Sequence, residues 1–120
     1  MAKEGINDEI GLELEDTLKI GRAVVRAYMF SLRRRTTTQI DLQNYFHISA
    51  DDASSLIAQL IDYGLGIESA EKGVYKVLHP RMGLTNVWNL LYPNPRDRPK
   101  TKRLVVDRMA AKLTKIYEDV

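Results

Sequence analysis

The chain has 120 residues, of which 44% are hydrophobic and 28% are charged. These values are ordinary for one soluble globular domain and exclude a largely disordered chain. The lack of cysteine excludes disulfides and thiolate chemistry. The first residues lack the layout of a secretory signal, and no apolar run reaches the roughly 18 residues of a membrane span. We therefore expect a cytoplasmic protein with no membrane partner.

Charge is distributed unevenly along the sequence. The net charge is only +2, but residues 1–19 hold two basic and six acidic side chains, whereas residues 96–120 hold eight basic and four acidic ones. This asymmetry indicates either a basic surface for polyanions or two ends that attract one another, within a chain or between copies.

The first third of the chain favours a long amphipathic helix. From Glu13 to about Leu32, apolar residues recur at helical spacing, at Leu14, Leu18, Val25, Tyr28, Met29 and Leu32. The opposite side carries Lys19, Arg22, Arg26 and Arg33. We interpret this basic side as a solvated surface, with phosphate contact as the alternative.

Residues 39–65 predict two short helices joined by a tight turn. Thr38 and Asp41 have the spacing of a capping box, which begins the first helix. Ser49 and Asp52 repeat that spacing, so a second helix begins after the turn. Its expected inward side chains are Ala53, Leu56, Ile57 and Leu60, and Gly64 can adopt the left-handed conformation that ends it.

The next segments predict a β-hairpin and another helix. Residues 67–69 and 74–78 are rich in β-prone side chains and flank a plausible loop at 70–73. Pro80 suits the first turn of a helix, and Pro93 stops it. Trp88, the only tryptophan, lies in this helix and is interpreted as a packing residue.

The C-terminal part divides into a connector and a tail helix. Residues 93–100 are proline-rich and basic, so we expect an extended connector there. Residues 101–120 predict a helix whose apolar seam repeats by three and four residues, at Val106, Met109, Leu113, Ile116 and Val120. We favour a homodimer formed through this seam, with packing inside the chain as the alternative.

Nothing in the sequence nominates an active site, a metal or a cofactor. His47 and His79 are the only histidines and lie far apart, without acidic residues at ligand spacing. Asp51 and Asp52 occupy a helix start, where carboxylates have a structural role. We therefore expect a protein that is not an enzyme.

The stretch from Ile48 to Leu60, closed by residues 62–65, resembles the winged helix-turn-helix pattern of an Ile-Ser turn, a helix and a Gly-Leu exit into the wing. Its character is closest to small archaeal regulators of the Lrp-like and TrmB-like kinds, and the resemblance covers about Glu13 to Val120. It implies a mainly α fold with a small β-hairpin. Residues 1–92 would form the winged domain, followed by the connector and a C-terminal dimerisation helix.

The resemblance also implies a set of DNA-binding residues. On the second helix of the pair, the residues facing DNA would be Ala50, Asp51, Ser54, Ser55 and Ala58. Gln39 and Gln43 would lie near the phosphate backbone, and Lys72 and Lys76 would serve the wing. Because that helix is acidic, positive charge must come from elsewhere, namely from Arg33, Arg34, Arg35, Arg81, Arg96, Arg98, Lys100, Lys102 and Arg103.

The sequence thus predicts a homodimeric double-stranded DNA-binding protein, either a transcription regulator or a nucleoid-associated protein. A protein-interaction module is the main alternative, favoured by Asp51, Asp52 and Asp62. A third possibility is a repressor that senses a small molecule in a pocket between its first and last helices.

Overall fold

The computed structural model describes residues 2–71 and 73–119, with side chains from residue 9 onward. Within these residues the chain is mainly helical, with a small antiparallel sheet. The elements in chain order are α1 (Ala2–Leu18), α2 (Arg22–Arg34), β1 (Thr36–Thr38), α3 (Gln39–Phe46), α4 (Ala50–Asp62), β2 (Gly66–Glu68), β3 (Val74–Val77), α5 (Pro80–Leu91) and α6 (Lys100–Glu118).

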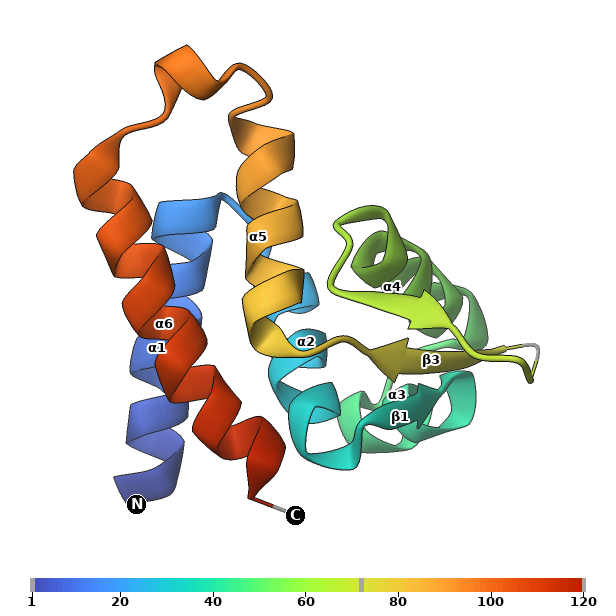
Figure 1. Cartoon of the computed structure of the whole chain (residues 1–120). Helices are drawn as coiled ribbons and strands as arrows, with labels where there is room; N and C mark the ends of the chain where they lie inside the picture. The colour runs from blue at the N-terminus through green and yellow to red at the C-terminus, as the bar shows by residue number, and fades with distance from the viewer. Residues whose placement is uncertain (1, 72, 120) are drawn as a thin grey trace.

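Two groups of elements lie side by side (Figure 1). Helices α1, α5 and α6 pack against one another on one side, and α3, α4 and the sheet form the other. Helix α2 contacts elements of both groups, and its buried residues are Val24, Val25, Ala27, Tyr28, Ser31 and Leu32. A single apolar core therefore runs through both groups by way of α2.

The expected helix from Glu13 to Leu32 is two helices, so this prediction was wrong. The chain leaves α1 after Leu18, and Lys19 adopts a positive φ of 57°. Gly21 is extended, with a ψ of 149°, and caps the start of α2. Ile20 is buried between the two helices, so the break itself contributes to the core.

The pair of helices at 39–65 is confirmed, together with its caps. The amide of Asp41 donates to Thr38 Oγ1 at 3.2 Å, and the amide of Thr38 donates to Asp41 Oδ2 at 2.9 Å. Ser49 accepts from the amide of Asp52 at 3.1 Å and begins α4. Gly64, with a φ of 78°, follows the end of α4 in the left-handed conformation that was predicted.

The predicted hairpin is present as β2 and β3, but the sheet also contains a strand that the sequence analysis did not predict. β1 pairs with β3, so that the strand order is β1-β3-β2. Arg35, with a φ of 65°, turns the chain from α2 into β1, and its carbonyl accepts from the amide of Val77 at 2.8 Å. Thr37 is buried and donates to Ser31 Oγ at 3.2 Å.

The tail helix is confirmed as α6, but its apolar seam packs inside the chain. Val106, Met109 and Leu113 are almost completely buried, and α6 contacts α1, α2 and α5. Ile116 is half-buried against the same core, and Val120 lies outside the described residues. These side chains would have to leave the core to form a dimer interface, so the seam follows the intramolecular alternative. The connector contains one short 3-10 turn, at Pro95–Asp97.

Candidate nucleic-acid interface

The candidate interface is built on α3 and α4, which we call the helix pair. His47, at the end of α3, adopts the left-handed conformation with φ 54° and ψ 48°. The amide of Ile48 then donates to the carbonyl of Gln43 at 3.4 Å. Gln39 Nε2 donates to the carbonyl of Ala50 at 3.1 Å and joins the start of α3 to the start of α4. The turn and this cross-link fix the angle between the two helices.

Helix α4 buries one side and exposes the other. Ala53 and Leu60 are buried, and Leu56 and Ile57 pack against the core as expected. The residues that were expected to face DNA are exposed, namely Ala50, Asp51, Ser54, Ser55 and Ala58. Gln39 and Gln43 on α3 are half-buried. The structure thus collects the proposed reading residues on one accessible surface of small and hydroxyl side chains.

That surface is electronegative. Helix α4 contains Asp51, Asp52 and Asp62, all exposed, and neither lysine nor arginine. At the start of α3, the carboxylate of Asp41 accepts a hydrogen bond from the amide of Thr38. Within the described residues, the amide of Ser49 at the start of α4 has no such bond to a carboxylate. The whole segment 36–78 holds six acidic and two basic side chains. Cations from outside this segment are needed before it can approach phosphates closely.

The three consecutive arginines at the end of α2 have different surroundings. Arg34 pairs with Asp41 of α3 at 3.2 Å and lies over the ring of Phe30. Arg35 donates to the carbonyl of Tyr117 at 2.9 Å and lies 4.3 Å from the centre of its ring. Arg33 is exposed. Arg34 therefore borders the helix pair, whereas Arg35 ties β1 to the end of α6.

The β2–β3 hairpin contributes one described cation. Lys76 is exposed on β3, opposite Thr36 on β1 and Ile67 on β2. Lys72 lies outside the described residues. Arg81 is exposed in the first turn of α5, just beyond the sheet.

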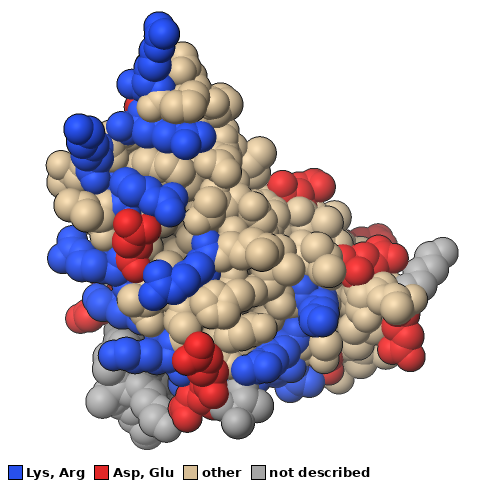
Figure 2. Space-filling view, in the orientation of Figure 1, with Lys and Arg blue, Asp and Glu red and all other residues tan. Residues whose placement is uncertain are grey.

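The remaining predicted cations lie at the other end of α5. Helix α5 has 12 residues and so carries the chain about 18 Å from the end of β3 to the connector. Arg98 donates to the carbonyl of Tyr92 and to Asn89, while Arg103 pairs with Asp107 and lies over Trp88. Arg96, Lys100 and Lys102 are exposed nearby. Figure 2 shows blue cations over the connector and all along the side of α6, and red side chains near the sheet and α4.

Titration is perturbed at one carboxylate of the helix pair and at two core phenols. The hydrogen bond from the amide of Thr38 is the main cause that lowers the pKa of Asp41; burial opposes it, and Arg34 adds to it. Burial raises the pKa of Tyr28 and of Tyr75 well above the usual value, so both phenols stay neutral. Their oxygens have no hydrogen-bond partner within the described chain.

Sequence reasoning missed an aromatic cluster that lies beside the arginines of α2. Phe30 of α2 and Tyr45 of α3 have ring centres 4.3 Å apart, and Phe46 contacts both rings edge-on. The available signal was the repeat of Arg22, Arg26 and Arg33 along one side of α2. The folding of α3 back onto that side could not be read from the spacing.

Comparisons with protein-family models, curated proteins and solved structures found no match to this chain. None of the helices in the described part of the chain has the length and apolarity needed to cross a membrane. Among residues 9–71 and 73–119, no three histidine or carboxylate side chains gather in a way that could hold a metal ion.

Proposed function

We propose that this chain is a winged-helix protein that binds double-stranded DNA, as a transcription regulator or a chromatin-associated protein. The observation that carries the proposal is the exposed outer surface of α4, held by the left-handed turn after α3 and followed directly by the β2–β3 hairpin. The element order from α2 to β3, with the strand order β1-β3-β2, supports the winged-helix assignment.

In this proposal α4 enters the major groove and the loop between β2 and β3 contacts the phosphate backbone. Ser54 and Ser55 carry hydroxyl groups that can donate to base edges or phosphates. Phosphate attraction comes from Arg33 at the end of α2, from Lys76 on the sheet and from Arg81. The connector cations would extend the contact only along a longer duplex.

Homodimerisation remains part of the proposal, but through another surface. The outer side of α6 exposes Leu104 beside Ala111, in a shallow hollow bordered by Asp107 and Arg108. A two-fold contact there would leave the buried seam intact and set the spacing of two half-sites. Sedimentation should give twice the chain mass of 13.7 kDa, and a single-chain mass would remove the dimer.

The test is a fluorescence anisotropy titration with a random-sequence duplex across a salt series. We expect binding that weakens steeply with salt, since each neutralised phosphate contributes about 0.9 to the logarithmic slope. The double variant Arg33→Gln/Lys76→Gln should lower that slope by roughly two. The matched control Lys112→Gln/Lys115→Gln removes the same charge from α6 and should leave the slope nearly unchanged. A protein that captures no duplex at low salt would refute DNA binding.

The acidity of α4 favours a second function, that of a protein-interaction module. In that case the exposed carboxylates Asp51, Asp52 and Asp62 dock a basic protein, and the wing only supports the helix pair. The same titration distinguishes the two functions. The module would show no duplex binding, and the Arg33→Gln/Lys76→Gln variant would behave as the wild type does.

A further inference from the structure

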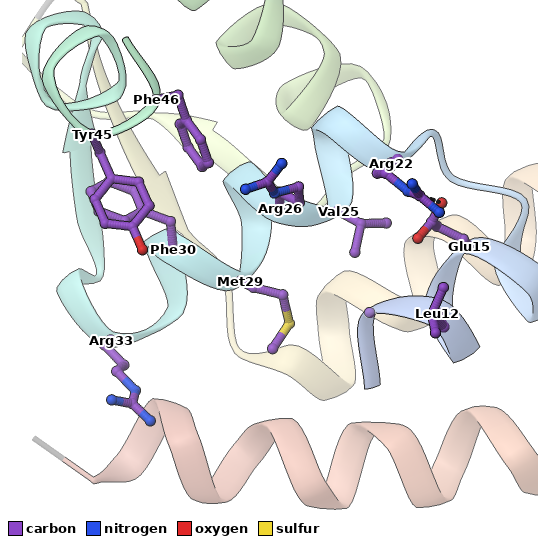
Figure 3. A pocket seen from close by; sticks show the side chains of 11 residues that line it. Leu12, Glu15, Arg22, Val25, Arg26, Met29, Phe30, Arg33, Tyr45 and Phe46 are labelled. Atoms are coloured by element: carbon purple, nitrogen blue, oxygen red, sulfur yellow. Dashed lines mark hydrogen bonds and ion pairs between the residues drawn. The ribbon is translucent and has the colours of Figure 1, made fainter. Parts of the chain in front are cut away.

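An open groove runs along the outer side of α2, between α1 and the end of α3 (Figure 3). It has a volume of about 700 Å³, within the range of small-molecule sites in proteins. Its lining residues come from three elements, and those that matter here are Glu15 of α1, Arg22, Arg26 and Arg33 of α2, and Tyr45 and Phe46 of α3.

The groove is cationic. Among the side chains from residue 9 onward that the structure describes, three arginines and one carboxylate line it, and that carboxylate, Glu15, pairs with Arg22 at 3.4 Å. The guanidinium of Arg26 lies 5.7 Å from the centre of the Phe46 ring. Arg33 stands at the far end and has no ion pair within the described residues. Arg26 and Arg33 are therefore available to an incoming anion, to which a guanidinium can donate two parallel hydrogen bonds.

The groove also presents an aromatic surface to solvent. Tyr45 is 61% exposed although its ring lies 4.3 Å from Phe30 and 4.9 Å from Phe46, centre to centre. Met29 and Leu12 extend the apolar surface along the floor and the rim, and Leu12 is 55% exposed. Stacked rings beside guanidinium groups suit a flat apolar body attached to an acidic group.

We propose that this groove binds a small amphipathic anion, with an aromatic or aliphatic body and a carboxylate, sulfonate or phosphate group. The body would lie on Phe30, Tyr45 and Met29, and the acidic group would bind Arg26 or Arg33. The size of the groove limits the ligand. Arg22 and Arg33 are 11 residues apart on one helix, about 16 Å along its axis. A groove of this length can hold a small molecule. The proposal does not depend on DNA binding.

The position of the groove differs from the one expected from sequence. A pocket between the first and last helices was one possibility there, whereas α6 contributes no lining residue to this groove. Its third wall is the last turn of α3, where Tyr45 and Phe46 directly precede the left-handed turn at His47.

The experiment uses the whole chain, free of nucleic acid, and two fluorescent probes of similar shape. Anilinonaphthalene sulfonate carries one negative charge, and phenylnaphthylamine is its neutral counterpart. We expect saturable binding of one sulfonate probe per chain and weaker binding of the neutral probe. Amide chemical shifts should change at Leu12, Phe30, Tyr45 and Phe46 on addition of the sulfonate probe.

Variants assign the binding to the groove. Arg26→Gln/Arg33→Gln should weaken the sulfonate probe roughly tenfold or more, because each lost charge-assisted hydrogen bond is worth at least about tenfold. Tyr45→Ala should weaken both probes. The control Lys112→Gln/Lys115→Gln removes two charges from α6 and should change sulfonate binding less than about twofold.

Several outcomes would overturn the proposal. These are equal affinity for the two probes, equal loss in the groove and control variants, or shift changes confined to α6. Failure of the sulfonate probe to bind would also overturn it, whether the protein sediments as one chain or as two. Far-ultraviolet circular dichroism checks that each variant is folded. If the double variant is not, Arg33→Gln alone carries the test, because Arg33 is exposed and free of an ion pair in the described chain.

Discussion

Helices α4 and α6 are both amphipathic and both bury one side, but they differ in charge and in what holds them. Helix α4 contains three acidic and no basic residues, whereas α6 contains six basic and two acidic ones. Helix α4 begins at a serine cap, and α6 begins at Pro99 without a side-chain cap. Of these two helices, the one that we propose enters a DNA groove is thus the one whose charge is less suited to it.

This difference shows that the order of the elements and the charge of their surfaces are separate evidence about function. The element order around α4 follows from local signals in the sequence and is independent of which ligand the surface binds. Helix α6, which carries six basic residues, lies on the opposite side of α5 from α4 (Figure 1). Each property can therefore be changed without the other, which makes the comparison testable.

The largest effect should come from the buried side of α6. Leu113→Ala removes a fully buried side chain from contact with the core and should lower the free energy of unfolding by about 2–5 kcal/mol. The control Leu90→Ala, at an exposed position on α5, should change it by less than about 0.5 kcal/mol. Urea denaturation at two protein concentrations gives both values. A midpoint that rises with concentration is expected from the dimer proposed above and does not bear on the seam. A loss of less than about 0.5 kcal/mol for Leu113→Ala would show that the seam lies outside the core of the chain.

The local elements of the fold were predictable because their signals are local. Thr38 and Ser49 cap the helix pair, Gly64 ends α4, and Pro80 begins α5, as their neighbours in the sequence indicated. Each of these effects depends on hydrogen bonds or backbone angles within a few residues. The mainly α class and the hairpin followed from the same signals.

The features that were not predicted depend on contacts between distant segments. Residues Thr36–Thr38 form β1 because they pair with β3, which lies about 40 residues later in the sequence. The break at residues 19–21 is stabilised by the burial of Ile20. A repeat of three and four residues also looks the same whether α1 and α5 or a second chain cover the seam of α6.

The candidate site was predictable only in part. The exposure of Ser54 and Ser55 follows from the helical period, which turns these residues away from Ala53 and Leu60, whereas Ala50 is exposed at the first position of the helix. The separation of the connector cations from α4 follows from the length and direction of α5, and the groove on α2 follows from where α3 folds back. Neither arrangement has a local signature in the sequence.

The second effect tests whether α4 or α6 contacts the duplex. Replacing Asp51 and Asp62 by asparagine removes two negative charges from the outer surface of α4. If this surface faces DNA, affinity for a random duplex at low salt should rise roughly fivefold for each of the two charges, since an exposed charge pair at contact is worth about 1 kcal/mol. Anisotropy titrations measure the change.

The matched experiment on α6 is the titration of Lys112→Gln/Lys115→Gln with the same duplex. We expect a change of less than about twofold if α4 is the reading helix. A large loss in the α6 variant, with no gain in the α4 variant, would reverse the comparison. The duplex would then lie on the basic side of α6.

The smallest effect concerns the caps, which hold the helix pair and are absent from the start of α6. Because the folded-state pKa of Asp41 lies below its usual value of 3.8, its contribution to stability is present above that pH. This contribution is lost as the pH falls through the folded-state pKa. Asp41→Asn should therefore differ most from the wild type near neutral pH, and the two stabilities should converge in acid. Urea denaturation from pH 7 down to about pH 2 follows this convergence.

Salt separates the two groups that act on Asp41. The main cause is the hydrogen bond from the Thr38 amide, and the ion pair with Arg34 at 3.2 Å contributes less. At about 1 M salt, where the Debye length is about 3 Å, the ion pair is screened but the hydrogen bond is not. Most of the difference between wild type and Asp41→Asn should therefore survive in high salt. Its disappearance there would mean that Arg34, and with it the contact between α2 and the helix pair, supplies the stabilisation that we assign to the cap.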